Sequence, residues 1–304
     1  MTILDYIKSK KARIDIMEIM ENRYQLNLQL EDFSIPEHLF KYSELNKFTL
    51  NNLKENNLTA TSPTEFNDIY DSSMHFNSTY RVEEEIKSLN KYIQTFNYEE
   101  IINLDKLSRD IIQNTNELDE DKFASLTKDY RIVCLSTDYG NIKMWGQYGD
   151  NNQGICTCYN LSKSKNNLNA FTYPIIYLKE PINVTDMCED LNNLDLATLV
   201  SVISKSIEWE NEKEWRIVFG LLGCKEKRIE LINIPKPECI YLGPKFIDKF
   251  RGLKERRDTR EIIYQEFLEL VKELNIKIKM ARPQISKYKL DFVDIDVYEI
   301  IKSL

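Results

Sequence analysis

The chain has 304 residues, 42% of them hydrophobic, which is enough to bury a sizeable core without disulfides or a metal ion. Its 41 basic and 49 acidic residues give a net charge of -8 and are spread along the whole length, which excludes a broad nucleic-acid-binding surface. The sequence contains no apolar run long enough to span a membrane and no secretion signal at its start. We therefore expect a cytoplasmic protein that makes no membrane contact.

The six cysteines show neither zinc-knuckle nor thioredoxin-like spacing. Three of them, Cys134, Cys156 and Cys158, fall within apolar runs, where a free cysteine behaves as a small hydrophobic residue. We expect reduced thiols and no bound metal.

The first half of the chain shows mainly helical periodicity. Apolar residues recur at intervals of three and four from 3 to about 29, which predicts a helical extension over residues 1–37, with a face available to a protein partner. A second helix is predicted between 48 and 58, before a turn that contains proline. Residues 82–127 contain neither glycine nor proline and predict a helical insertion.

Strand patterns dominate the second half. Helices are predicted from about 194 to 207 and from about 256 to 274. Strands grouped in this way favour an α+β fold, with a central, mostly antiparallel sheet and flanking helices in one domain from 38 to 304. The predicted strands cover residues 132–135, 154–159, 174–178, 214–219, 228–232, 239–242 and 276–280.

Charged residues alternate along the segment 212–219. An extended backbone would send Trp215 to the core face and would place Glu212, Glu214 and Arg216 together on the opposite face. This charged face either meets water, where its ion pairs would be weak, or lines a cleft.

An aromatic pair lies on a short predicted helix just after the first of these strands. Trp145 and Tyr148 are three residues apart, so they point the same way on a helical turn. They could stack against a planar ligand or belong to the core. Upstream, the polar run 62–68 has side chains that can satisfy their own backbone in a tight turn.

Taken together, the order and spacing of these motifs resemble the bacterial family known as domain of unknown function 2971, over residues 38 to about 245. The chain departs from the family at Gly146-Gln147, where Ser-His is frequent, so no role for a histidine is carried over. The matching motifs are Phe40-Lys41-Tyr42, the run 62–68 with Asp71, Val133-Cys134-Leu135-Ser136, Met144-Trp145-Gly146-Gln147-Tyr148, Gly154-Ile155-Cys156, and Trp209 with Glu212-Lys213-Glu214-Trp215-Arg216.

The resemblance implies a setting and an activity. Family members look similar to proteins found near phage-defence genes, and they show a remote likeness to ADP-ribosyltransferases. Those enzymes carry an early polar residue at the nicotinamide site, a strand ending in Ser-Thr, and a late Glu-x-Glu or single glutamate on a strand. Lys41-Tyr42, Ser136-Thr137 and Glu212-Lys213-Glu214 occur here in that order.

On this analogy the cofactor is NAD and the acceptor is an unidentified macromolecule. Glu214 would stabilise the positive charge that develops on the ribose, and Glu212 would orient or deprotonate the acceptor. The remaining predicted cofactor contacts are Lys41, the rings of Tyr42, Trp145 and Tyr148 against nicotinamide, Ser136 in support of the glutamate, and Arg216 on the pyrophosphate.

Two other classes of function stay open. A non-catalytic module could sense a nucleotide or a phage protein through the same pocket. A metal-dependent nuclease could use Asp68, Asp71 and His75, although no second histidine lies nearby and turns rich in aspartate are common. Neither a phosphate-binding glycine-rich loop nor a Gly-x-Ser-x-Gly motif is present, which sets aside P-loop nucleotidases and serine hydrolases.

Overall fold

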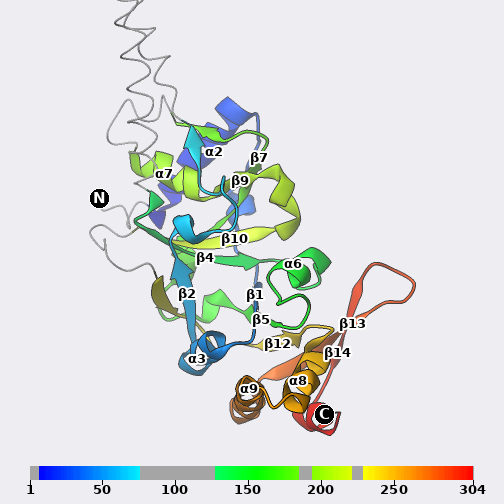
Figure 1. Ribbon diagram of the computed structural model, residues 1–304. Coiled ribbons are helices and arrows are strands. Elements are labelled where there is room, and N and C mark those ends of the chain that lie inside the picture. The colour runs from blue at the N-terminus through cyan, green and yellow to red at the C-terminus, as the bar shows by residue number, and fades with distance from the viewer. Residues whose placement is uncertain (1–6, 76–126, 185–193, 221–228, 304) are drawn as a thin grey trace, which may run out of the picture.

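The computed structural model describes residues 7–75, 127–184, 194–220 and 229–303 (Figure 1). Helices and a mostly antiparallel sheet give the α+β fold predicted from the sequence. The predicted helical insertion at 82–127 lies outside the described residues, apart from Thr127. Within the described residues, no helix has both the length and the apolar character needed to cross a membrane.

A ten-stranded sheet forms the centre of the molecule. Its main path runs β11-β2-β4-β1-β5-β12-β13-β14, and β10 joins β4 to β6 off this path. Among the described strands of this sheet, only β12 and β13 pair in parallel. The strands of this sheet are β1 (Leu39–Ser43), β2 (Asn57–Thr61), β4 (Tyr130–Ser136), β5 (Ile155–Tyr159), β6 (Thr172–Pro174), β10 (Glu214–Gly220), β11 (Ile229–Asn233), β12 (Cys239–Leu242), β13 (Lys277–Pro283) and β14 (Leu290–Asp294).

Two further strand pairs are parallel and short. The strands β3 (Met74–His75) and β8 (Ile182–Asn183) form one pair, and β7 (Ile176–Leu178) and β9 (Ser204–Ser206) form the other. The second pair lies beside β10, because the backbone N–H of Ile175 donates to the carbonyl of Glu214.

Helices gather at the two ends of the sheet (Figure 1). At one end α8 and α9 bury Phe246, Phe250 and Phe267 against β12 and β13. At the other end α2 and α7 share a second core with β4 and β10. The α-helices are α2 (Lys10–Tyr24), α3 (Lys47–Glu55), α6 (Ile142–Gln147), α7 (Leu194–Val202), α8 (Phe246–Glu255), α9 (Glu261–Glu273) and α10 (Val297–Lys302), and the 3-10 helices are η1 (Leu30–Phe33), η2 (Pro63–Glu65), η4 (Leu161–Lys163), η5 (Leu168–Phe171) and η8 (Ile207–Glu212).

The N-terminal helix packs as part of the fold. Ala12, Ile16 and Met20 are fully buried in the core that α2 shares with α7, so the apolar face of the predicted extension is covered within the chain. A protein partner of this helix would meet its polar face. The apolar periodicity seen in this part of the sequence therefore reflects packing within the chain.

Several predicted elements have different boundaries in the structure. The helix predicted for 48–58 ends at Glu55, where Asn56 takes a left-handed conformation (φ 50°), and β2 follows at once. The long helix predicted for 256–274 starts later, as α9, and α8 precedes it. The helix predicted for 194–207 stops at Val202 and gives way to β9.

Candidate functional site

Two strands, β2 and β1, share one edge of β4, and we call the gap between them the fork of the sheet. The other edge of β4 pairs with β10 over seven residues. The forked edge pairs with β2 only at Ile132, opposite Thr61, and with β1 only at Ser136, opposite Phe40. Alternate residues of a strand direct their backbone groups to the same edge, so the carbonyl of Cys134 faces the gap between β1 and β2.

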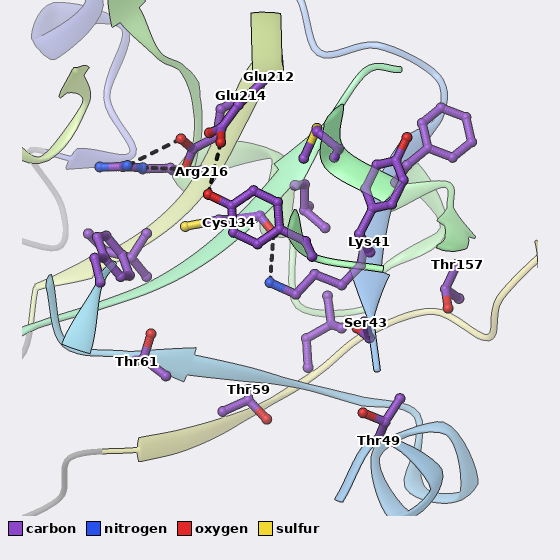
Figure 2. A pocket seen from close by; sticks show the side chains of 18 of the residues that line it. Lys41, Ser43, Thr49, Thr59, Thr61, Cys134, Thr157, Glu212, Glu214 and Arg216 are labelled. Atoms are coloured by element: carbon purple, nitrogen blue, oxygen red, sulfur yellow. Dashed lines mark hydrogen bonds and ion pairs between the residues drawn. The ribbon is translucent and has the colours of Figure 1, made fainter. Parts of the chain in front are cut away.

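A cavity of about 560 Å³ occupies this fork (Figure 2). Elements β1, α3 and β2 form one side of it, and β10, η8 and α6 contribute the opposite side. Its polar lining falls into two groups: Lys41, Ser43, Thr49, Asn52, Thr59, Thr61 and Thr157 on the fork side, and Glu65, Asn67, Asp71, Gln147, Tyr148, Lys205, Glu212, Glu214 and Arg216 on the other.

Arg216 ties β10 to the turn at Asp71, between η2 and β3. Its guanidinium makes two parallel hydrogen bonds with the Asp71 carboxylate, of 2.8 and 2.6 Å. The Nε atom donates to Glu214 Oε1 at 2.7 Å, and Nη1 donates to the carbonyl of Val202 at 2.7 Å. The side chain of Arg216 is 0% exposed, and each of its three nitrogens donates to a protein group.

Lys205 joins the two predicted glutamates. Its ammonium donates to Glu212 Oε2 at 2.7 Å and to Glu214 Oε2 at 3.0 Å, and it lies 3.6 Å from Asp71 Oδ2. The hydroxyl of Tyr148 donates to Glu212 Oε1 at 2.8 Å. Figure 2 shows Glu212 and Glu214 adjacent at the same side of the cavity.

We call Asp71, Lys205, Glu212, Glu214 and Arg216 the buried ionic cluster. None of its side chains is more than 4% exposed. When all five groups are ionised, three carboxylates face two cations, which leaves one net negative charge beside the cavity. The charged face predicted from the sequence is therefore not a solvated strand face.

The charges of the cluster fix one another. Burial alone would raise the pKa of the Glu214 carboxyl, but Arg216 and Lys205 lower this pKa to about 2. Burial alone would lower the pKa of Lys205, but Glu214, Glu212 and Asp71 raise it. Glu214 is consequently ionised at every physiological pH and is a weak proton acceptor, so it can act only as a fixed negative charge.

Backbone conformation brings Glu212 to the cluster by a route that alternation does not predict. Glu212 is the last residue of η8, and Lys213 after it is left-handed (φ 47°), so the extended strand begins only at Glu214. The hydroxyl of Ser136 donates to the backbone carbonyl of Glu212 at 2.6 Å and anchors this turn. Ser136 itself is fully buried and does not line the cavity.

The three predicted aromatic contacts divide between cavity and core. Tyr42 and Tyr148 line the cavity, whereas Trp145 is fully buried and does not. The indole N–H of Trp145 donates to the carbonyl of Tyr139, and its ring packs edge-on against Tyr42 at 5.2 Å. Trp145 therefore supports the wall of the cavity from behind, as the core interpretation of this residue expects.

Lys41 stands apart from the cluster. Its ammonium donates to the carbonyl of Cys134 at 3.0 Å, across the fork, and lines the cavity (Figure 2). Among the described residues no carboxylate forms an ion pair with it.

Two residues of the cluster were missed or assigned another role by sequence reasoning. Lys205 was missed because a single lysine after an apolar helix gives no signal of its own. Asp71 was considered only as a metal ligand, together with Asp68 and His75. It pairs with Arg216 instead, and within the described parts of the chain no group of His, Cys, Asp and Glu residues could hold a metal ion. The side chain of His75 lies outside those parts.

The fold and site thus define an α+β protein with a polar cavity in a forked sheet and a buried ionic cluster at the side of that cavity. Residues 144–217 match the model of the family described as "Protein of unknown function (DUF2971)". The match includes Tyr148, Lys205, Glu212, Glu214 and Arg216, and it supports the domain family indicated by the order of the motifs. Searches among curated proteins and among solved structures found no match.

Proposed function

We propose that the cavity binds NAD and that the buried ionic cluster promotes cleavage of the bond between nicotinamide and ribose, as in an ADP-ribosyltransferase or an NAD glycohydrolase. One observation carries the proposal. The two glutamates predicted from the sequence converge on one cavity with Lys41, Tyr42 and Tyr148, and their cluster holds an excess negative charge there.

The electrostatics of the cluster suit this reaction. When the bond between C1′ and the nicotinamide nitrogen breaks, its electron pair leaves with neutral nicotinamide and positive charge develops on the ribose. Two cations already neutralise two of the three carboxylates, so the remaining negative charge can stabilise this transition state. Glu214, held ionised by its low pKa of about 2, supplies a fixed charge that needs no reorganisation.

Glu212 is the better candidate for contact with the acceptor. Its Oε1 atom is held by the hydroxyl of Tyr148, which lines the cavity and also accepts a hydrogen bond from the exposed Asn67. An acceptor oxygen, from water or a macromolecule, would form the new bond to C1′ and release its proton toward this carboxylate. Tyr42 and Tyr148 would pack against the nicotinamide ring.

The test is release of free nicotinamide from labelled NAD, with and without cell extract, measured by mass spectrometry. The wild-type protein should release nicotinamide, and Glu214→Gln should lower the rate at least 100-fold, as expected for loss of a transition-state charge. Glu210→Gln is the matched control, because Glu210 is an exposed glutamate in η8, the 3-10 helix that ends two residues before Glu214. Thermal unfolding establishes that each variant is folded. A folded Glu214→Gln protein with full activity would contradict the proposal.

A non-catalytic sensing module is the second candidate. One observation favours it, namely that Arg216 and Lys205 engage Glu214 so fully that the cluster could serve the architecture of the pocket alone. Such a module would bind NAD or another nucleotide without releasing nicotinamide. A Glu214→Gln variant that still binds and still protects cells from phage would support it. For either activity we propose a cytoplasmic role in anti-phage defence, and the support for that setting is the resemblance of the motifs.

A further inference from the structure

We infer that the fork of the sheet is an anion subsite, with Lys41 as its cation, and that it takes a phosphate or pyrophosphate group of the ligand. An ammonium has three N–H donors, and the contact with the Cys134 carbonyl occupies one of them. That carbonyl carries no net charge, and among the described residues no carboxylate forms an ion pair with Lys41. The positive charge of Lys41 is therefore not neutralised there. Such an unneutralised cation, half-buried in a cavity wall, is suited to an anionic ligand.

The geometry assigns this role to Lys41 rather than to Arg216, which the sequence suggested as the pyrophosphate contact. Every nitrogen of Arg216 already donates to Asp71, Glu214 or a backbone carbonyl, and its side chain has no exposed surface. Binding a phosphate there would require breaking buried ion pairs, which is strongly unfavourable. Lys41 can bind one without losing any ionic contact.

The surroundings of Lys41 have the composition of an anion site. Elements β1, α3 and β2 contribute no carboxylate to the lining of the cavity. They contribute donors instead, and one is oriented by its neighbour: the amide of Asn52 donates to the Thr59 hydroxyl at 2.8 Å, so the hydroxyl proton of Thr59 is left to donate elsewhere. Ser43, Thr49 and Thr61 line the same side.

The cavity is therefore bipolar. Lys41 and the hydroxyl groups provide a positive, donor-rich side, whereas the buried ionic cluster provides a negative one (Figure 2). A fitting ligand carries its phosphates at one end and a group that is or becomes cationic at the other. Nucleotides that carry a positively charged ring, such as the nicotinamide of NAD, belong to this class, and only that last assignment rests on the proposed function.

The experiment compares ligands with and without phosphate by titration calorimetry. ADP-ribose and inorganic pyrophosphate are the phosphate probes, and adenosine is the neutral probe. The wild-type protein should bind ADP-ribose at least 10-fold more tightly than adenosine, and Lys41→Met should remove most of that difference, since one charge-assisted hydrogen bond is worth about a factor of 10 or more. Thr59→Val, which removes only a hydroxyl, should weaken ADP-ribose binding by a smaller factor.

Lys47→Met is the matched control. Lys47 is exposed at the start of α3, outside the cavity lining, and its loss removes the same charge from the same region. The Lys47→Met protein should bind ADP-ribose with the affinity of the wild type. A folded Lys41→Met protein with wild-type affinity would overturn the subsite, and so would a wild-type protein that binds neither phosphate probe at millimolar concentration.

Failure of the two proposals can be told apart. If no nicotinamide is released but ADP-ribose or pyrophosphate binding depends on Lys41, the anion subsite stands and the NAD-cleaving activity falls. If nicotinamide is released at the same KM by the wild type and by Lys41→Met, the activity stands and the subsite falls.

Discussion

Replacing Arg216 with methionine removes a charge on which three segments of the fold converge. The guanidinium bridges Asp71 in the turn between η2 and β3, Glu214 on β10 and the carbonyl of Val202 at the end of α7. The methionine side chain would fill part of the same volume but would leave Asp71 without its bidentate partner. Three buried carboxylates would then face Lys205 alone.

The size of the effect follows from the pKa of Glu214. A pKa lowered from 4.5 to about 2 corresponds to about 3 kcal/mol of folding free energy at neutral pH, at 1.36 kcal/mol for each pKa unit. Arg216 is the largest favourable contributor to that shift. Breaking a buried ion pair by removing one partner typically costs about 3–5 kcal/mol. We therefore expect Arg216→Met to lower the free energy of unfolding at pH 7 by about 3–5 kcal/mol.

The pH dependence provides the sharper check. A carboxyl whose pKa is lowered in the folded state stabilises that state above its unfolded pKa of 4.5, and this contribution is lost as the pH falls toward 2. The difference in stability between wild type and Arg216→Met should consequently be largest above pH 5 and should shrink between pH 4.5 and 2. Urea unfolding, followed by tryptophan fluorescence at pH 7 and pH 3, measures it.

The control is Arg251→Met. Arg251 lies on α8, its side chain is 43% exposed, and its ion pair with Asp248 is 3.5 Å long, so its replacement should cost less than about 1 kcal/mol. The reasoning is refuted if Arg216→Met costs no more than this control, or if its cost is the same at pH 3 and pH 7.

Three further expectations test other parts of the structure. A Cβ on Gly154 would lie 2.3 Å from the carbonyl oxygen of Ser43 on β1, so Gly154→Ala should lower the free energy of unfolding. A Cβ on Gly146 in α6 would meet nothing within 4 Å, so Gly146→Ala should raise the free energy of unfolding by about 0.5–1 kcal/mol; urea unfolding measures both. Cys156 is fully buried and burial raises its pKa, so iodoacetamide should modify it only after unfolding, as judged by peptide mass spectrometry. Tyr148→Phe should lower the free energy of unfolding by only about 1 kcal/mol, measured in urea, but should slow nicotinamide release, because Glu212 loses the hydroxyl that donates to it. An unchanged rate of release would show that Tyr148 takes no part in the reaction.

The sequence predicted the apolar strands well, because burial on both faces leaves an unmistakable signature. All five residues of β5 are buried, and β4 is an almost continuous apolar run, so both were found. The strand β2 (Asn57–Thr61) was missed because the helical pattern predicted for 48–58 runs on into its first residues. The strand is defined by its pairing with β11 along its length and with β4 at Thr61. Such pairing depends on tertiary contacts that local propensity does not contain.

The candidate site was predictable only where it depends on the local alternation of residues along a strand. Alternation correctly placed Glu214 and Arg216 on one face of a strand. It did not predict that Lys205 would be buried, because a lysine is stable there only when the folded chain brings several carboxylates around it. It also placed Glu212 on the strand, although this residue reaches the cluster through a 3-10 turn and a left-handed lysine.

Two features of this fold lower its stability in isolation, and both open onto the same cavity. The fork leaves β4 paired at single positions where a regular sheet would pair it continuously, and the carbonyl of Cys134 is met by a lysine rather than by a strand. The cluster buries one more carboxylate than its cations neutralise. A sequence selected for stability alone would pair β4 continuously with its neighbours and would replace the buried ionic cluster with apolar residues. Their coincidence at one cavity, with opposite charges on its two sides, is the physical reason to place the function of this protein there.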